Sequence, residues 1–237
     1  LLFAREGANV GIGDIREDEG RGVAAEITAA GGDSLFVRLD VTSEQDWAGA
    51  VDAVLDRFGR LDILVNNVGG MIPGTIESLS DEQWTDIINR NLMAFVWTIR
   101  SAIPQLKNSA GAKVLNVSGM TGKQLLVGAL TTTLPNTAII GFTKVMAGEL
   151  AKDGITVNNI CPGIVNTESW GPRAEMMAKV RGTTADQVRR MFSDLTLLGR
   201  WGEPEEIGNV AAFMVSDKNS YMTGTTVEVC GGWARYI

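Results

Sequence analysis

The feature that most constrains the fold of this chain is the regular alternation of short strand-like runs with helical segments. The strand-like runs are rich in β-branched and apolar side chains, and the segments between them carry apolar residues at helical spacing. Such alternation predicts a parallel β-sheet with helices on both of its faces. The expected strands lie at 8–14, 34–40, 62–65, 113–117, 155–160 and 225–229.

Residues that commonly begin helices support the segments between these strands. Ser43 with Asp46 and Ser80 with Gln83 have the spacing of a capping box, in which the first side chain satisfies a backbone N–H of the new helix. Pro135 and Pro204 are each expected in the first turn of a helix, where proline is permitted. Further helical segments are expected at 17–30 and within 166–198, and the helix of Pro135 is expected to end near 152.

The composition narrows both the number of domains and the classes of function. A chain of 237 residues, 45% of them hydrophobic and 21% charged, is expected to form one domain over 1–237. The net charge of −7 disfavours nucleic acid as a partner. Because the sequence has no histidine, histidine-ligated metals and serine–histidine–aspartate triads are excluded, and no metal site is expected.

Three features of the sequence bear on where in the cell the protein is expected and on whether the chain is complete. Cys161 and Cys230 lack the spacing of a disulfide framework or a zinc site, which favours a reducing, cytoplasmic setting. The apolar runs are shorter than the roughly 20 residues that span a bilayer, so no membrane association is expected. The opening stretch LLFAREGANV has neither an initiator methionine nor a signal pattern, and it resembles the end of a helix followed by a turn. We therefore expect a fragment of a longer chain.

Several motifs in a fixed order resemble those of the short-chain dehydrogenase/reductase family over essentially the whole chain. They include DILVNNVGG, Asn91 in NRNLMAF, LNVSG, GITVNNICPGIVNT, GRWGEPEEI and TGTTVEVCGGW. The resemblance implies a Rossmann-like doubly wound parallel sheet in a single α/β domain. It also implies that the family's first strand and glycine-rich turn, TGxxxGxG, are missing, because the GIG at Gly11–Gly13 lies in the stretch that resembles the second strand. Since the missing strand is central in the family, a break in the sheet is expected.

The resemblance further implies a site for nicotinamide dinucleotide at the ends of the strands. Asp14, with Ile15 beside it, stands where the family holds the ribose hydroxyls, and its negative charge favours NAD over NADP. A plain turn-forming role is the competing interpretation of Asp14. The other residues that match the family's cofactor contacts are Asp40, Val41, Asn67, Val68, Gly69, Pro162, Gly163, Val165 and Thr167.

The family's catalytic positions are mostly substituted. The family transfers a proton with a tyrosine, which is activated by a lysine and assisted by a serine and an asparagine. Aligning NTAIIGFTK and NVSG with the corresponding family segments puts Thr132 at the tyrosine, Asn136 at the lysine and Gly119 at the serine. Only Asn91 is retained. A threonine hydroxyl is a much weaker acid than a phenol, whose unperturbed pKa is about 10. The resemblance therefore implies an atypical active site and a possible pseudoenzyme.

Other polar residues offer weak substitutes for the missing acid and base. Lys123 follows the Gly119 turn and Ser118 precedes it, but a surface lysine is the simpler interpretation of Lys123 because no neighbour in the sequence explains a lowered pKa. Tyr236, in the C-terminal tail, could reach another subunit, although a packed tail is the simpler interpretation. Asn91 has a structural alternative as well, that of a buried amide bonded to backbone.

Three functions stay open at this point. The first is an NAD-linked oxidoreductase for a small hydroxy or keto compound, with substituted or substrate-assisted proton transfer. The second is a catalytically silent family member that binds NAD or only partners an active homologue. The third is a lyase or dehydratase that reuses the pocket. Because the family forms dimers and tetramers, the resemblance implies a homo-oligomer or a mixed oligomer.

Overall fold

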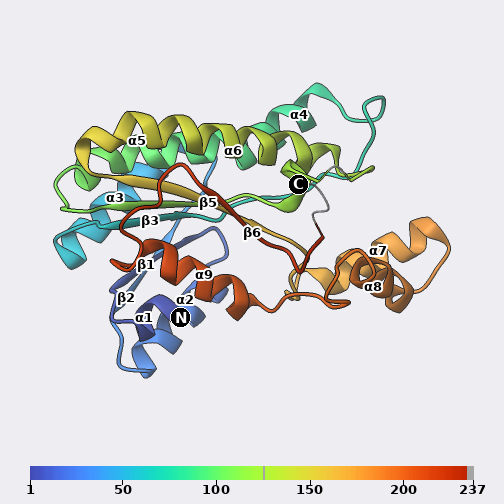
Figure 1. Cartoon of the computed structure of the whole chain (residues 1–237), viewed down its shortest axis with the longest axis horizontal. Helices are drawn as coiled ribbons and strands as arrows, with labels where there is room; N and C mark the ends of the chain where they lie inside the picture. The colour runs from blue at the N-terminus through green and yellow to red at the C-terminus, as the bar shows by residue number, and fades with distance from the viewer. Residues whose placement is uncertain (125, 234–237) are drawn as a thin grey trace.

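The computed structural model describes residues 1–124 and 126–233, apart from the side chain of Val180. The described strands pair in parallel and form two sheets, with the orders β1-β2 and β3-β4-β5-β6 (Figure 1). The strands are β1 (Val10–Asp14), β2 (Ser34–Arg38), β3 (Ile63–Asn66), β4 (Lys113–Val117), β5 (Thr156–Pro162) and β6 (Thr226–Val229). Each overlaps a predicted strand, although β3 extends one residue and β5 two residues beyond the predicted ends.

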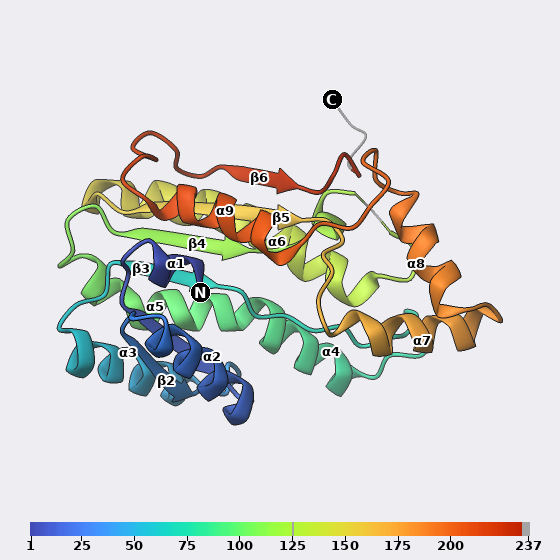
Figure 2. The same ribbon diagram turned by 90° about the horizontal axis from the view of Figure 1, so that it is seen from below.

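Helices cover both faces of the strands, as the alternation predicts. Helices α3, α5 and α6 lie on one face and α1, α2 and α9 on the other, while α7 and α8 stand together at one end (Figures 1 and 2). The helices are α1 (Leu2–Arg5), α2 (Glu17–Ala29), α3 (Glu44–Phe58), α4 (Asp81–Ile88), α5 (Ala94–Leu106), α6 (Leu130–Leu150), α7 (Trp170–Arg181), α8 (Ala185–Ser193) and α9 (Pro204–Val215), with the π-helical turn η1 (Asn89–Met93) and the 3-10 turns η2 (Met120–Gly122) and η3 (Ala151–Asp153). None of the helices in the described residues is both long and apolar enough to span a bilayer.

The two predicted capping boxes differ in completeness. At the start of α4, Ser80 Oγ accepts from the Gln83 backbone N–H (3.3 Å), and Gln83 Oε1 accepts from the Ser80 N–H (3.0 Å). At α3, Ser43 Oγ accepts from the Asp46 N–H (3.2 Å), but the Asp46 carboxylate accepts from the Asp40 N–H instead (3.0 Å). At α3, only the bond from the Asp46 N–H to the Ser43 side chain is therefore confirmed, and the reciprocal bond of the capping box is not formed.

The expected position of Pro135 in the first turn of a helix is wrong. Helix α6 begins at Leu130, so Pro135 lies inside it. The first turn instead forms around Ala129, whose carbonyl accepts from the N–H groups of Thr132 (3.1 Å) and Thr133 (2.8 Å). Because proline lacks an N–H, Pro135 cannot bond to the carbonyl four residues earlier.

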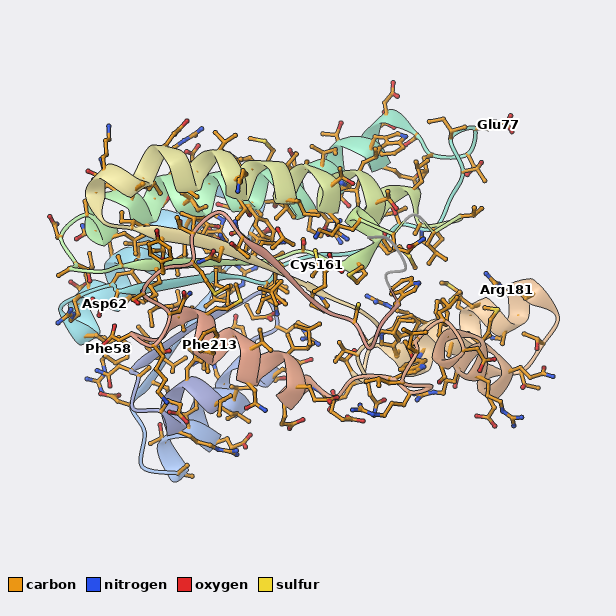
Figure 3. All side chains as sticks on the ribbon, in the orientation of Figure 1. Phe58, Asp62, Glu77, Cys161, Arg181 and Phe213 are labelled. Carbon is orange, nitrogen blue, oxygen red and sulfur yellow. The ribbon has the colours of Figure 1, made fainter. Side chains whose placement is uncertain are left out.

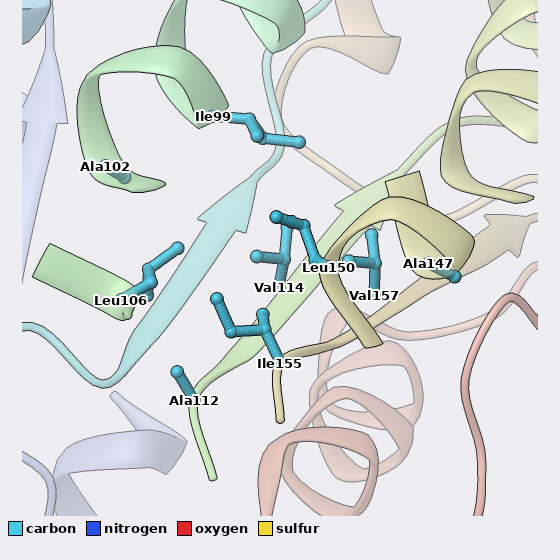
Figure 4. Packing of buried hydrophobic residues seen from close by; sticks show 9 residues of the cluster. All are labelled: Ile99, Ala102, Leu106, Ala112, Val114, Ala147, Leu150, Ile155 and Val157. Carbon is cyan, nitrogen blue, oxygen red and sulfur yellow. The ribbon is translucent and has the colours of Figure 1, made fainter. Parts of the chain in front are cut away.

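The apolar core lies on both faces of the four-stranded sheet. Between this sheet and helices α5 and α6 lies the cluster of Figure 4, which comprises Ile99, Ala102, Leu106, Ala112, Val114, Ala147, Leu150, Ile155 and Val157. On the opposite face Leu115 and Ile160, which are fully buried, pack with Ala211, Met214 and Val215 of α9. The sheet is thus enclosed on both sides, which fits strands that are almost continuously apolar.

A row of polar side chains crosses the four-stranded sheet on the α6 side. Asn66, Asn116, Asn159 and Thr226 are register partners on β3, β4, β5 and β6. Asn66 Nδ2 donates to Asn116 Oδ1 (2.9 Å), and Asn116 Nδ2 donates to Thr143 Oγ1 of α6 (2.9 Å). The three asparagines are buried, and these hydrogen bonds offset part of the cost of removing the amides of Asn66 and Asn116 from water. Among the described residues, Asn66 Oδ1 and Asn159 Oδ1 have no hydrogen-bond partner.

The break in the sheet that the resemblance implies is present. The described strands form two separate sheets, in which β1 pairs only with β2 and β3 pairs only with β4. Val65 of β3, which is an edge strand of its sheet, is 37% exposed. Helix α3 contacts both β2 and α5, and it thereby joins the two sheets.

Candidate functional site

The residues predicted to hold the cofactor all lie at or just beyond the carboxyl ends of strands. Asp14 ends β1, Asp40 and Val41 follow β2, Asn67–Gly69 follow β3, and Pro162 ends β5 before Gly163–Thr167. Arg90 of η1 bears on two of these segments: a Cβ on Gly70 would lie 3.3 Å from its Cδ, and its charge contributes to the lowered pKa of Asp40. In open parallel sheets, ligands bind beyond the carboxyl ends of the strands where the order changes.

Asp14 closes the turn after β1. Its Oδ1 accepts from the Arg16 backbone N–H (2.8 Å), and the Arg16 Nε lies 3.6 Å from the same oxygen. Arg38 is the register partner of Asp14 on β2 and pairs with Glu17 and Asp46. The side chain of Asp14 is 40% exposed and Ile15 is exposed, so both are accessible. Asp14 therefore does form a turn, and its role in binding the ribose stays a prediction.

The other predicted cofactor residues form tight turns. The pKa of Asp40 lies below its usual value, chiefly because Thr42 donates to it from its hydroxyl (2.7 Å) and its backbone N–H (2.9 Å). Val41 accepts from Trp47 Nε1 through its carbonyl (3.2 Å). A Cβ on Gly163 would lie 2.7 Å from the Cα of Cys230, so only glycine lets the segment after β5 approach β6 this closely.

Asn91 lies in the π-helical turn η1 and is buried, with 5% of its surface exposed. Its Nδ2 donates to the Gly70 carbonyl (2.8 Å), and its Oδ1 accepts from the Gly70 N–H (2.8 Å). The amide therefore holds the segment after β3 against the helix, as the structural interpretation of Asn91 requires. Single-turn π-bulges occur frequently at functional sites, and a catalytic role for Asn91 stays a prediction.

The structure brings together two of the three positions that the sequence motifs align with the family's catalytic residues. Gly119 follows β4 and Asn136 lies on α6, and a Cβ on Gly119 would be 2.9 Å from Asn136 Nδ2. Asn136 Nδ2 donates to Thr121 Oγ1 (2.8 Å). Thr132, one turn before Asn136, donates its hydroxyl to the Ala129 carbonyl (3.0 Å). These groups are all uncharged, so no side chain at positions 119, 132 and 136 can be ionised near neutral pH.

The candidate substitutes for the acid and base are engaged elsewhere. Ser118 Oγ accepts from Asn159 Nδ2 (2.9 Å) and lies 3.1 Å from Cys161 Sγ, so it is held over β5. Lys123 is partly exposed, with 26% of its side-chain surface accessible, and its Nζ lies 2.5 Å from Glu228 Oε1 on β6. Tyr236 lies outside the described residues.

A buried thiol, that of Cys161, lies beside this ion pair, because Cys161 is the register partner of Glu228. Cys161 is fully buried and central in the molecule (Figure 3). Burial raises the pKa of its thiol, while the hydrogen bond with Ser118 and the charge of Lys123 act in the opposite direction. Cys161 and Glu228 are register partners on β5 and β6, a relation that only strand pairing creates.

Three aromatic rings hold α7 and α8 to the rest of the chain. The ring centroid of Trp170 lies 5.2 Å from that of Phe192 and 4.9 Å from that of Trp201, in edge-to-face arrangements. Phe192 and Trp201 are buried with Cys161 and Ile164, which lie at the carboxyl end of β5. This helical pair therefore borders the carboxyl edge of the sheet, where the cofactor and catalytic positions lie.

Comparisons with known proteins agree with this geometry. A family profile described as enoyl-(acyl carrier protein) reductase matches residues 1–234. The chain is 35% identical, over 98% of its length, to the 2,5-dichloro-2,5-cyclohexadiene-1,4-diol dehydrogenase of Sphingobium indicum, of which it covers 88%. The chain belongs to the short-chain dehydrogenase/reductase family. It is likewise 35% identical to the cyclopentanol dehydrogenase of Comamonas testosteroni, with 98% and 89% of the two chains covered.

Solved structures of the short-chain dehydrogenase/reductase fold superpose closely. L-sorbose reductase from Gluconobacter frateurii, solved with NADPH and L-sorbose, gives a TM-score of 0.94 at 28% identity and covers all of this chain and 90% of its own. A variant of actinorhodin polyketide ketoreductase with NADPH gives 0.93 at 28% identity, with 99% and 90% covered. The Rossmann-like fold implied by the sequence motifs is thereby confirmed.

Proposed function

We propose that this chain is an NAD(H)-linked oxidoreductase for a small hydroxy or keto compound, and that it exchanges hydride slowly. The observation that carries the proposal is the gathering of Asp14, the Asn67–Gly69 turn and the Pro162–Gly163 turn at the carboxyl ends of the strands. The dinucleotide supplies or accepts the hydride, and the chain supplies its binding surface. Membership of the short-chain dehydrogenase/reductase family supports this assignment.

The charges around Asp14 support NAD rather than NADP. Arg16 is within salt-bridge distance of Asp14 and Glu19, and Arg38 of Glu17 and Asp46. Arg21 also pairs with Glu17, so three cations face four carboxylates, which leaves one negative charge in excess near the ribose position. A 2′-phosphate would be repelled there, whereas the ribose hydroxyls of NAD can donate to Asp14.

The names of the relatives support a cyclic alcohol or ketone as substrate. The dehydrogenases from Sphingobium and Comamonas are named for a cyclohexadienediol and for cyclopentanol, and a 36% identical relative from Mycobacterium tuberculosis is named for hydroxysteroids. The aromatic rings of α7 and α8 border the same edge of the sheet in this chain. We propose a small cyclic secondary alcohol, or the matching ketone, as the substrate class.

Slow turnover follows from the groups at the catalytic positions. Oxidising an alcohol requires its hydroxyl proton to leave with the hydride, and the chain has no ionisable side chain at positions 119, 132 or 136. Losing general acid–base assistance costs a factor of about 10² to 10⁴. We therefore expect turnover lower by that factor than in a family member that carries the phenol.

The break between the sheets bears on the same site. We propose that a further parallel strand fits between the unpaired edges of β1 and β3, and that the turn after it completes the dinucleotide site. Glycine at positions 11 and 13 leaves little bulk on β1 beside Val54 and Leu39. Pairing on both sides would satisfy backbone groups that each edge now exposes.

A silent subunit is the second candidate, and one specific observation favours it. The hydroxyl of Thr132 and one of the two N–H groups of the Asn136 amide donate to partners within the chain, so these donors are not directed to a substrate. On this proposal the chain keeps the dinucleotide site and associates with copies of itself or with an active homologue. Its two free cysteines fit a reducing, cytoplasmic setting for either candidate.

The test separates binding from turnover. Titration with NADH and NADPH, followed by nicotinamide fluorescence, should give binding of NADH that is at least tenfold tighter, on the order of 1.4 kcal/mol. When cyclopentanol is the substrate, NAD should be reduced to NADH slowly but measurably. A variant that carries Gly119→Ser, Thr132→Tyr and Asn136→Lys together should turn over about 10²- to 10⁴-fold faster with unchanged NADH affinity.

The outcomes distinguish the candidates. Binding of neither dinucleotide would overturn both. Binding of NADH with no turnover over a panel of cyclic alcohols and ketones would leave the silent subunit. Turnover that survives Thr132→Ala and Asn136→Ala unchanged would show that proton transfer uses other residues.

A further inference from the structure

Asn136 joins helix α6 to the turn that follows β4. Its Nδ2 donates to Thr121 Oγ1 (2.8 Å) in η2. The next residue, Thr137, donates its hydroxyl to the Gly122 carbonyl (3.1 Å). Two neighbouring side chains of α6 therefore hold the same short turn.

Two glycines make room for this attachment. A Cβ on Gly119 would lie 2.9 Å from Asn136 Nδ2, and a Cβ on Gly122 would lie 2.7 Å from the Asn136 carbonyl carbon. Gly119 has φ −165° and ψ 159°, an extended conformation that any residue adopts. Glycine is thus needed at 119 for space and not for backbone freedom.

We propose that the Asn136 side chain holds the Gly119–Lys123 turn against α6 through its hydrogen bond to Thr121. We further propose that this hydrogen bond cannot form when residue 119 carries a side chain. The atom in the way at Gly119 is the end of a flexible side chain, so a Cβ there would push the amide off Thr121 rather than displace backbone. The atom in the way at Gly122 belongs to the backbone of α6 and cannot move aside. The identities at 119 and 136 are therefore coupled, whereas glycine at 122 is required whatever residue occupies 136.

Coupling of this kind predicts a specific pattern in a double-mutant cycle. Gly119→Ala and Asn136→Ala each lose the same hydrogen bond, so each should lower Tm by about 2–4 °C. The double variant should lose that bond only once, and its Tm should lie within about 1 °C of the Asn136→Ala value. Gly122→Ala should lower Tm further, and adding Asn136→Ala should not restore it.

Gly141→Ala is the matched control. Gly141 lies on the same helix, and a Cβ there would meet nothing within 4 Å. Because alanine favours helices over glycine, this variant should keep or raise Tm. Thr121→Val should reproduce Asn136→Ala, and both should speed amide hydrogen exchange over residues 119–124 while exchange in β4 stays unchanged.

The cycle can contradict the proposal in two ways. If Gly119→Ala leaves Tm unchanged, or if the losses of the two single variants add in the double variant, positions 119 and 136 are independent. If Gly119→Ala is insoluble, a soluble double variant supports the coupling and an insoluble one overturns it. The measurements of Tm, solubility and hydrogen exchange need neither cofactor nor substrate, so their outcome is independent of the proposed activity.

Discussion

At the scale of single residues, Glu206 bonds to two neighbours at the start of α9. Its carboxylate accepts from both Nη atoms of Arg200 (2.7 Å each) and from the Glu203 backbone N–H (2.8 Å). The Arg200 guanidinium and the Glu203 N–H lower the pKa of Glu206 to about 2, against a usual value of 4.5. The charged form is therefore favoured in the folded state.

This shift predicts how stability depends on acid. Because the folded pKa is lowered, the stabilisation by Glu206 is complete above about pH 4.5 and is lost as the pH falls toward 2. Tm measured by circular dichroism should fall less steeply in Glu206→Gln than in the unaltered protein over that window. Glu205→Gln, next to it on α9, is the control. Parallel curves for the unaltered protein and Glu206→Gln would contradict the prediction.

Some of the site could be predicted residue by residue, and some could not. Counting from two separate motifs aligned Gly119 and Asn136 with the family's serine and lysine, and the structure places the two residues side by side. The pairing of Lys123 with Glu228 could not be foreseen, because the two residues are 105 positions apart and meet only through the order of the strands. Local sequence carries no signal for such a contact.

At the scale of elements, the prediction of strands succeeded because buried parallel strands are short apolar runs bounded by turns. The ends of helices were predictable where a side chain forms the cap, as at Ser80. They were not predictable at α6, where backbone N–H groups bond to the Ala129 carbonyl and no side chain caps the helix. Pro135 therefore gave a misleading signal.

The cap of α4 gives a prediction at this scale. Ser80→Ala removes the acceptor for the Gln83 N–H and should lower the free energy of unfolding by about 0.5–2 kcal/mol. Ser80→Asp should keep most of that stability, because aspartate also accepts from this N–H. Urea denaturation measures both. Equal losses in the two variants would show that the hydroxyl does not act as a cap.

At the scale of the whole molecule, the two sheets differ in how well their strands are paired. Strands β4 and β5 have partners on both sides, whereas β1 pairs only with β2. The break was predictable from family strand order alone, since no local pattern marks it. The fold as a whole was predictable because many independent motifs agreed on it.

This difference predicts separate opening of the smaller sheet. Amides of β1 and β2 should exchange at least about tenfold faster than those of β4 and β5, because a sub-global opening costs less than unfolding the whole molecule. Native-state hydrogen exchange at low denaturant measures this. The edge strand β6 is the control for the effect of one unpaired side. A common rate for all strands would indicate a single cooperative unit.

The asparagine row across the larger sheet has a consequence for assembly during folding. If β4 slid by one residue relative to its neighbours, Asn116 would turn toward the apolar side chains of α9, and Leu115 would enter the polar row. An unsatisfied amide in such surroundings is costly. The row of asparagines therefore favours the native register of the strands over pairings shifted by one residue.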